Sequence, residues 1–365
     1  MDAPAPLRRG WTTGACATAA AKAAFVALRT GDFPDPVTIT LPRGERPAFA
    51  LARGEFVAGG AVAGVVKDAG DDPDVTHGAL VLATVRPLPK GSGVRFRAGP
   101  GVGTVTRPGL PLPPGEPAIN PMPRRMIREA LDEVAPAGAD AEVEIAIPGG
   151  EVLAERTLNG RLGIVGGLSI LGTTGIVVPY SCAAWIDSIH RGIDVARASG
   201  LGHVAGATGA ASEAAVRGLH GLPETALIEM GDFVGGMLKY LRRHPVARVS
   251  IAGGVAKMTK LAQGMLDLHS KRGAADMAAL AGLVGDAGLA ERVRGANTVA
   301  EAFALAPMLG EAIAAGAWRV AAGVLDHPGI ALEVVVFDRE GRLMGRAEFA
   351  PSAAHAPSSP RKRRR

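Results

Sequence analysis

The second half of the chain alternates between two kinds of segment, and this alternation limits the fold more than any other sequence feature. From about residue 161, short apolar runs of β-type residues separate longer segments with helical spacing. Such alternation builds a parallel sheet covered by helices, and ligands of these sheets bind at the carboxyl ends of the strands. The expected strands are 163–165, 203–205, 225–229 and 248–252, and the expected helices are 183–198, 211–219, 233–242 and 257–270.

The first 160 residues have a different rhythm, which is typical of an α+β domain. An Ala-rich helix should begin at Thr12–Gly14, run to about Arg29 and stop at Gly31. Gly and Pro, 50 and 27 of 365 residues, then separate short strand-like runs without a repeat period. The expected strands are 37–41, 48–51, 61–66, 80–85, 94–96 and 141–147, with a second helix over 124–134.

These patterns predict an α/β protein with two domains, in line with the length of the chain. We expect an α+β domain over residues 1–160 and a C-terminal Rossmann-like domain over 161–350, with a mainly parallel sheet and flanking helices. Helical segments should fill 275–316, and a hairpin of 331–337 and 343–349 should turn at Glu340–Gly341. Residues 351–365 have the composition of a disordered basic tail.

Charge and cysteine content exclude several classes of function. The chain has 40 basic and 35 acidic residues, and the last five residues, all basic, account for the whole excess. A nucleic-acid-binding protein should carry a basic face on its folded body, so we expect no nucleic-acid partner. Cys16 and Cys182 form no CxxC pattern, which favours a reducing cytoplasm. The charge-free run 162–186 holds five glycines and Pro179, so we expect no membrane span. Homo-oligomerisation stays open.

The densest polar stretch, residues 67–78, follows an apolar strand directly. It holds four aspartates, Lys67 and His77. Clustered carboxylates repel one another, so Lys67, His77, backbone N–H groups or a ligand should relieve the repulsion. A ligand-binding loop and a solvated Asp-rich turn are both consistent with the pattern. A calcium loop is not, because the alternating ligand spacing and the distal Glu are missing.

A glycine-rich loop over 166–175 lies between two apolar runs. It lacks the lysine that a phosphate-binding P-loop requires. Its backbone N–H groups and hydroxyls could approach a polar small molecule closely, but a tight turn between buried strands accounts for the same residues.

Polar residues also follow three of the expected strands in the second half. Glu229 ends one strand, and an acidic group in that place commonly holds ribose hydroxyls. Asp232 could bind a cofactor or cap the next helix, and His269 could be a general acid/base or a cation at a helix end. The residues alone therefore indicate an α/β enzyme with a nucleoside-containing cofactor. The strand-end residues are Thr208, Gly209, Glu229, Asp232, Gly253, Gly254 and Lys257.

Seven stretches, taken together, resemble the cobalt-precorrin-5B C1-methyltransferase family (CbiD). The resemblance covers about residues 8–275, and the aspartate stretch and the Ser-Ile-Leu-Gly-Thr-Thr-Gly stretch are its most specific parts. The region 275–350 matches in length and character only. The stretches are 10–17, 67–78, 101–105, 117–121, 167–177, 230–233 and 268–271.

The resemblance implies methyl transfer from S-adenosyl-L-methionine to C1 of cobalt-precorrin-5B, a carboxylate-rich tetrapyrrole, giving cobalt-precorrin-6A in the anaerobic-type branch of cobalamin biosynthesis. We expect the cofactor in the second domain and the tetrapyrrole between the domains. Catalytic candidates are His269, Lys257 and Asp68; cofactor-binding candidates are Gly172, Thr173, Thr174, Thr208, Gly209, Glu229 and Asp232; substrate-binding candidates are Thr12, Thr13, Lys67, Asp71, Asp72, His77, Asn120 and Arg124.

Two other classes of function stay open. One is a different Rossmann-like nucleotide-cofactor enzyme acting on a tetrapyrrole, either an oxidoreductase or a methyltransferase of another ring position. No G-x-G-x-x-G follows the first strand of the second domain, which argues against the oxidoreductase. The other, less favoured, is a nucleic-acid-binding protein that uses its basic tail.

Overall fold

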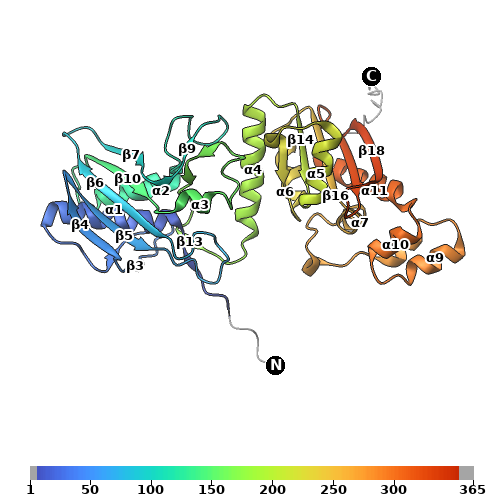
Figure 1. Cartoon of the computed structure of the whole chain (residues 1–365), viewed down its shortest axis with the longest axis horizontal. Coiled ribbons are helices and arrows are strands. Elements are labelled where there is room, and N and C mark those ends of the chain that lie inside the picture. The colour runs from blue at the N-terminus through green and yellow to red at the C-terminus, as the bar shows by residue number, and fades with distance from the viewer. Residues whose placement is uncertain (1–5, 353–365) are drawn as a thin grey trace, which may run out of the picture. The chain divides into compact units, whose positions relative to one another are not determined.

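The computed structural model describes residues 6–352 and divides into two compact units, shown in Figure 1. The first unit ends at Cys182 and the second begins at Ala183. The expected boundary at residue 160 lies too early, because short strands after it pair inside the first unit. These are β11 (Ile164–Val165) with β9 (Thr104–Val105), β12 (Gly167–Leu168) with β8 (Gly101–Val102), and β13 (Ile176–Val177) with β1 (Gly10–Trp11).

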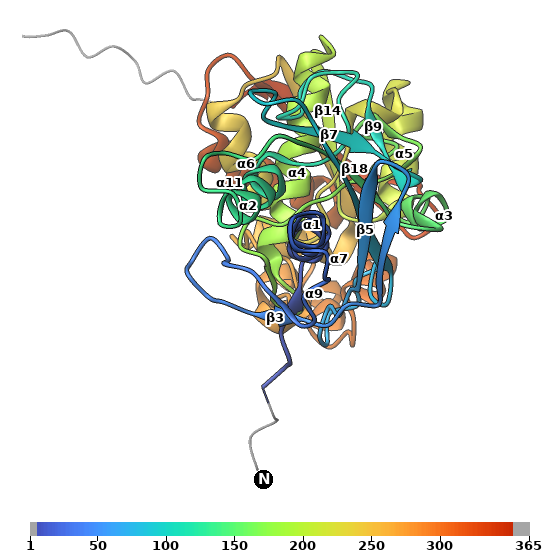
Figure 2. The same cartoon turned by 90° about the vertical axis from the view of Figure 1, so that its left-hand side faces the viewer.

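A buried helix forms the centre of the first unit. Helix α1 (Thr13–Thr30) begins where Thr12 Oγ1 accepts a hydrogen bond from Ala15 N–H at 3.2 Å, and it ends at Gly31 with φ +87°. This confirms the helix and the stop that the sequence predicts. Alanines line its buried surface, so neighbouring elements can approach closely. Figure 2 shows α1 end-on, between α2 (Pro121–Asp132) and β5 (Gly60–Val66).

A five-stranded sheet covers α1 in the order β4-β5-β6-β10-β7. All neighbouring strands are antiparallel except β10 and β7. Side chains of β10 alternate between buried and half-buried, as the two-residue period of a strand requires. The remaining bounds in this unit are β2 (Val37–Thr38), β3 (Ala48–Phe49), β4 (Arg53–Val57), β6 (Leu80–Pro87), β7 (Val94–Ala98), β10 (Ala141–Ala146) and α3 (Gly150–Ala154).

The second unit is built on another five-stranded sheet, ordered β15-β14-β16-β17-β18. The first four strands are parallel and β18 is antiparallel to β17. Numbered along the chain, the order is 2-1-3-4-5. The mixed α/β class expected from the sequence is thereby confirmed. The strands are β14 (His203–Ala207), β15 (Leu227–Glu229), β16 (Arg248–Gly254), β17 (Ala331–Phe337) and β18 (Leu343–Pro351).

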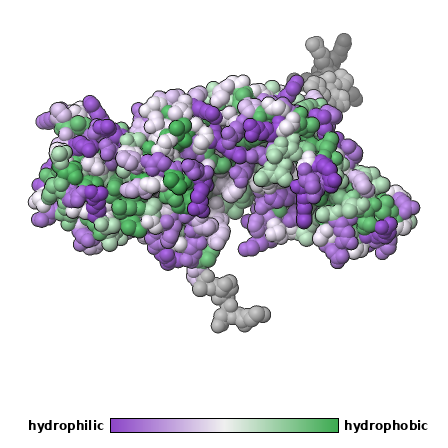
Figure 3. Space-filling model, in the orientation of Figure 1, coloured by the Kyte–Doolittle hydropathy of each residue, from purple (hydrophilic) through white to green (hydrophobic). Residues whose placement is uncertain are grey.

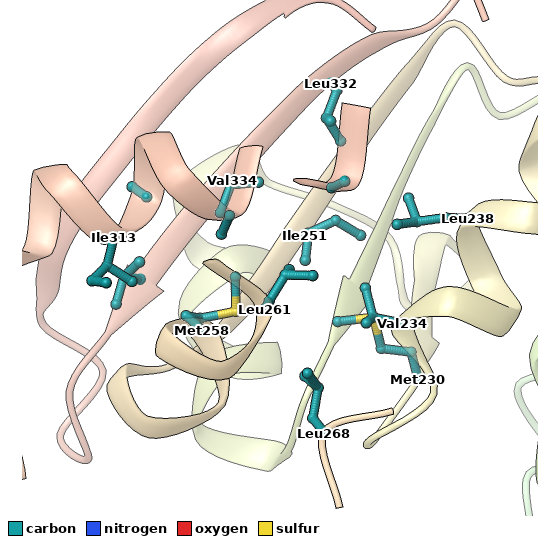
Figure 4. Packing of buried hydrophobic residues seen from close by; sticks show 14 of the residues in the cluster. Met230, Val234, Leu238, Ile251, Met258, Leu261, Leu268, Ile313, Leu332 and Val334 are labelled. Atoms are coloured by element: carbon teal, nitrogen blue, oxygen red, sulfur yellow. The ribbon is translucent and has the colours of Figure 1, made fainter. Parts of the chain in front are cut away.

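Helices cover both faces of this sheet. Val204, Ile251 and Val334 face the larger core, part of which Figure 4 shows, whereas their neighbours in the strands face helix α5. Successive side chains of a strand point to opposite faces of the sheet, so each face packs against its own core. The helices are α4 (Cys182–Ala198), α5 (Ala210–His220), α6 (Val234–Arg243), α7 (Val255–Ala262), α8 (Met277–Ala281), α9 (Ala287–Arg294), α10 (Val299–Leu305) and α11 (Leu309–Leu325), with 3-10 turns at Glu224–Ala226 and Ser270–Arg272.

Two sequence expectations about this unit were wrong. The helix expected over 257–270 is α7, which ends at Ala262, because Gly264 takes φ +92° and turns the chain. Leu268 is still buried, but it lies in a loop. Its N–H donates to Asp232 O at 2.9 Å. The tail was expected from 351, but β18 includes Pro351, and Ser352 Oγ donates to His327 O at 2.7 Å. The rest of the basic tail lies outside the described residues.

Over residues 6–352, the structure holds no helix long and apolar enough to cross a bilayer. The face displayed in Figure 3 mixes hydrophilic and hydrophobic residues over both units.

Candidate functional site

Polar groups of the second unit meet where three neighbouring strands end. Thr208 follows β14, Glu229 ends β15, and Gly254 ends β16. Strand β14 lies between the other two: the chain passes from β14 to β15 on one side and then crosses back over β14 to β16 on the other side. In open α/β sheets this topological switch point is the usual ligand position. Thr208 N–H donates to Ala252 O at 3.0 Å, which fixes the first loop against β16.

Lys257 connects these strand ends. Its Nζ donates to the Thr208 carbonyl at 2.8 Å and lies 3.1 Å from Asp232 Oδ1. The contact with Asp232 is an ion pair without hydrogen-bond geometry, so this buried oxygen accepts no hydrogen bond from any described residue. Buried acceptors are almost always satisfied. The Lys257 ammonium therefore serves as the counter-charge of this oxygen, which the surrounding protein covers.

Glu229 presents an available acceptor. Its backbone carbonyl accepts a hydrogen bond from Trp185 Nε1 at 3.2 Å, whereas its carboxylate forms no ion pair or hydrogen bond with residues 6–352. The carboxylate ends the second strand of the unit, the place where an acidic side chain binds ribose hydroxyls in dinucleotide-binding sheets. Glu229 and Asp232 together thus fit a nucleoside-containing ligand.

His269 belongs to the same neighbourhood. The preceding residue, Leu268, donates its N–H to the Asp232 carbonyl, and Lys260 Nζ donates to the Leu268 carbonyl at 3.1 Å. The His269 side chain is exposed, and its Nδ1 accepts a hydrogen bond from Lys271 N–H at 3.1 Å. In the neutral ring this contact leaves the hydrogen on Nε2. The structure brings His269 and Lys257 together with Thr208, Gly209, Glu229 and Asp232.

Three of the resemblance stretches interlock in the first unit. Trp11 N–H donates to Asp68 O at 2.7 Å, Thr12 N–H to Gly175 O at 3.0 Å, and Gly14 N–H to Leu171 O at 3.1 Å. A Cβ at Gly10 would lie 2.0 Å from the carbonyl carbon of Ala69. Thr12 and Thr13 are buried at this junction. Close backbone packing thus accounts for much of this glycine-rich pattern.

The glycine-rich loop lies in the first unit and not beside the sheet of the second. Gly172, with φ +132°, lies against Thr12: a Cβ there would be 2.4 Å from Thr12 Oγ1. Thr174 Oγ1 accepts a hydrogen bond from Ile176 N–H at 3.2 Å, and Thr173 is exposed. The expectation that Gly172, Thr173 and Thr174 share a domain with the strand-end residues is wrong, because β13 pairs with β1.

Lys67 is buried and its charge is matched inside the aspartate loop. Its Nζ contacts the Asp74 carboxylate and Thr76 Oγ1. Burial raises the pKa of Asp74, but the Lys67 ammonium and the Thr76 hydrogen bonds outweigh it, so this pKa lies below its ordinary value. The pair anchors the loop. Nearby in α1, burial raises the pKa of the Cys16 thiol to about 12.

The other charged side chains of this loop also pair or form hydrogen bonds with protein groups. The Arg8 guanidinium pairs with Asp68 and, with the Gly70 N–H, lowers the pKa of Asp68 to about 2. Asp71 accepts from Arg8 N–H at 2.6 Å and Asp72 from Tyr180 N–H at 2.8 Å, while His77 Nδ1 accepts from Ala69 N–H at 3.1 Å. Groups outside the loop, above all Arg8, therefore offset much of its repulsion, and the sequence pattern did not predict the contribution of Arg8.

Arg124 and Asn120 differ in the contacts that their side chains make within the protein. Arg124 donates to the carbonyls of Ile119 and Pro117 at 2.7 and 2.9 Å and pairs with Glu116 at 2.8 Å. These contacts indicate a structural role. The Asn120 side chain makes no capping bond at α2, although its N–H donates to Ile170 O at 2.9 Å.

No sequence motif pointed to two further residues, Asn159 and Trp185. Asn159 is buried; its Nδ2 donates to Gly167 O at 3.1 Å and its Oδ1 accepts from Ser169 Oγ at 3.4 Å. Trp185 lies beside Glu229, and only the rarity of tryptophan in the chain could have drawn attention to it.

These features define a two-unit α/β protein whose acidic and cationic strand-end groups meet at a topological switch point. The family model CbiD matches residues 1–179, and the model for CbiD, C-terminal domain, matches residues 267–348. The chain belongs to the CbiD family.

Similar proteins extend over almost the whole chain. A cobalt-precorrin-5B C(1)-methyltransferase from Agrobacterium fabrum is 65% identical over 361 residues, which cover 97% of this chain and 96% of the relative. One from Bradyrhizobium sp. is 63% identical, covering 98% and 97%. A crystal structure of the cobalamin biosynthesis protein CbiD from Archaeoglobus fulgidus is 29% identical, with a TM-score of 0.40 over 73% of this chain and 83% of that one.

Proposed function

We propose that this chain is an S-adenosyl-L-methionine-dependent methyltransferase that methylates C1 of cobalt-precorrin-5B, giving cobalt-precorrin-6A in the anaerobic-type branch of cobalamin biosynthesis. Relatives at 65% and 63% identity over nearly their full length carry the name cobalt-precorrin-5B C(1)-methyltransferase. The observation that carries the donor site is the free Glu229 carboxylate at the end of β15, three residues before Asp232, whose ion pair with Lys257 links this loop to Thr208.

The second unit, as a Rossmann-like sheet, holds the methyl donor at its strand ends. Glu229 accepts hydrogen bonds from the ribose hydroxyls, and Asp232 accepts from a donor group of the same ligand. The donor carries no phosphate, so the absence of a P-loop lysine is consistent with it. Lys257 offers a cation to the carboxylate of the methionine part, because its ammonium already lies between Thr208 and Asp232.

The protein's main task in this reaction is alignment. S-adenosyl-L-methionine supplies a methyl group that its sulfonium charge already activates; C1 forms the new bond as the sulfur–methyl bond breaks. Strand-end residues fixed by backbone hydrogen bonds, such as Thr208, hold their positions without further ordering. Lys257 orients the donor, and His269 Nε2–H can donate a hydrogen bond in the same neighbourhood.

Asp68 is a poor candidate for a proton-transfer role. A carboxyl with a pKa of about 2 is a weak base near neutral pH, and Arg8 holds it in the first unit. The first unit is the tetrapyrrole side of our proposal. Asn120 and Thr173 keep side-chain polar groups without partners among residues 6–352, so they can donate to the peripheral carboxylates of the substrate.

Mass spectrometry after incubation of the full chain with S-adenosyl-L-methionine and cobalt-precorrin-5B tests the reaction. We expect a gain of one methyl group, and NMR of the product should place it at C1. A product methylated at another ring carbon, or no methylation by a folded protein, would refute the proposal.

The position of the donor has its own test. Asp232→Ala should weaken binding of S-adenosyl-L-homocysteine at least about tenfold, the effect of losing one charge-assisted hydrogen bond. Unchanged affinity in this variant would contradict the assignment of the donor to the strand ends of the second unit.

A further inference from the structure

Trp185 lies directly beside the backbone of Glu229, the residue that ends β15. It belongs to α4, whose inward residues Ile189 and Ile193 anchor the helix in the core of the second unit. Its indole N–H donates to the Glu229 carbonyl at 3.2 Å. Its ring also contacts Gly231, since a Cβ there would lie 3.4 Å from two ring atoms. One hydrogen bond and one packing contact therefore fix the ring against the loop that follows β15.

The same indole is 43% exposed, which is unusual for a large side chain held in a defined position. The one polar atom of the ring is already satisfied by Glu229. The outer surface of the ring consequently needs no hydrogen-bond partner. A flat π system is the kind of group that covers such a surface best.

We propose that Trp185 stacks against the adenine base of the methyl donor. The inference rests on the proposed function, in which the Glu229 carboxylate holds the ribose. The base is bonded directly to that ribose, and Trp185 contacts the backbone of Glu229 and Gly231. The position of the base is therefore within the reach of one indole ring. Trp185 is a binding and positioning residue in this assignment, because it does not contact the reacting carbon.

Calorimetric titration of the full chain with S-adenosyl-L-homocysteine and with adenosine tests the assignment. Trp185→Leu should weaken both ligands about tenfold, since stacking of a base on an aromatic side chain contributes about that factor or more. Trp185→Phe keeps an aromatic face and should lose less affinity. Trp318→Phe is the matched control, because Trp318 lies in the same unit and donates to Leu332 O at 2.8 Å, away from Glu229.

A fluorescence titration reports on the ring without requiring a loss of affinity. Adding S-adenosyl-L-homocysteine should quench the tryptophan emission of the wild type and of Trp318→Phe, and Trp185→Phe should show no such quenching. Equal affinity of Trp185→Leu and wild type, together with quenching that persists in Trp185→Phe, would overturn the assignment.

Two further outcomes separate this inference from the proposed function. If Trp185→Leu binds S-adenosyl-L-homocysteine normally but binds the tetrapyrrole more weakly, the ring faces the substrate and the adenine assignment is wrong, while the methyltransferase proposal stands. If the folded wild type binds no S-adenosyl-L-homocysteine, the donor site and the Trp185 assignment fail together.

Discussion

Lys257 shows how a single side chain can organise the candidate donor site. Its stem starts in the first turn of α7, yet its ammonium reaches the Thr208 carbonyl after β14 and Asp232 after β15. One cation therefore ties together loops that follow three different strands. Removing it leaves Asp232 without a counter-ion and removes the positive charge offered to the donor carboxylate.

Lys257→Met should weaken S-adenosyl-L-homocysteine binding about tenfold or more, because a hydrogen bond to a charged group contributes about 1.5–3 kcal/mol. Lys239→Met is the matched control, since Lys239 is an exposed lysine of α6 in the same unit. Calorimetry on both variants measures the difference. Equal affinities would show that Lys257 only supports the fold.

Gly10 illustrates the opposite case, a residue required by packing alone. Gly10→Ala places a Cβ 2.0 Å from backbone of the aspartate loop, so we expect the free energy of unfolding to fall by about 1–3 kcal/mol or more. Gly160→Ala, in the same unit, meets no atom within 4 Å and should be nearly neutral. Urea denaturation measures both; a neutral Gly10→Ala would contradict the interlocked packing.

The sequence predicted most helices and strands, because their spacing and stop signals are local. Gly31 ends α1 and Gly341 turns the β17–β18 hairpin as expected. Pairing between distant segments is not a local property. Nothing in residues 164–177 themselves shows that they pair with strands of the first unit, so the glycine-rich loop was assigned to the wrong domain. The helix expected over 257–270 was too long for a related reason: Leu268 is buried, but it belongs to a loop and not to a helix.

The proximity of the strand-end residues was easier to predict than the contacts of the aspartate loop. Glu229 and Asp232 follow a strand in a strand–helix alternation, and the sheet topology then requires that such residues meet. The partners of the loop come from residues far away in the chain, such as Arg8 with Asp68. A contact that depends on the fold of the whole unit leaves no signal in the spacing of the loop itself.

A buried polar network connects α5 with the sheet on the face opposite the larger core. The fully buried Glu333 of β17 accepts from Ser250 Oγ at 2.6 Å and Arg346 Nε at 2.7 Å, and His220 Nε2 lies 2.7 Å from it. His203 Nε2 lies 2.9 Å from Ser250 Oγ, which completes the network. The network joins elements that otherwise meet through a small apolar cluster.

This network should make the second unit sensitive to acid. Burial, with the neighbouring His220, lowers the pKa of His203 to about 4, whereas an unfolded histidine titrates near 6.5. Between these values the unfolded chain binds more protons, so the free energy of unfolding should fall as the pH drops from about 6.5 to about 4. His203→Gln keeps a donor for Ser250 but cannot titrate. Its melting temperature should therefore fall less over that range; identical pH profiles would exclude His203 as the cause.

The net positive charge of the full chain comes from its last five residues. The 40 basic residues exceed the 35 acidic ones only because of Arg361–Arg365, and these lie outside the described residues. A chain that is otherwise balanced offers little electrostatic attraction to nucleic acid. The relatives at 65% and 63% identity cover almost all of both units, so the proposed activity concerns the folded body.

Deletion of residues 361–365 should accordingly leave kcat/KM for methylation within about twofold of the full chain, since the deletion removes no group of the proposed site. Steady-state kinetics on the two proteins measures this. A loss of methylation on deletion would give the basic end a role in the reaction.

The affinity of S-adenosyl-L-homocysteine for Glu229→Gln tests the donor site more directly than any other measurement. The carboxylate of Glu229 has no partner among residues 6–352, so the substitution should leave the melting temperature unchanged. Calorimetry should show the dissociation constant rising about tenfold or more, because an amide accepts ribose hydroxyls less strongly than a carboxylate. Glu340→Gln, an exposed carboxylate of the β17–β18 turn, should bind as the wild type does. Equal affinity of Glu229→Gln and wild type would contradict a methyl donor held at the strand ends of the second unit.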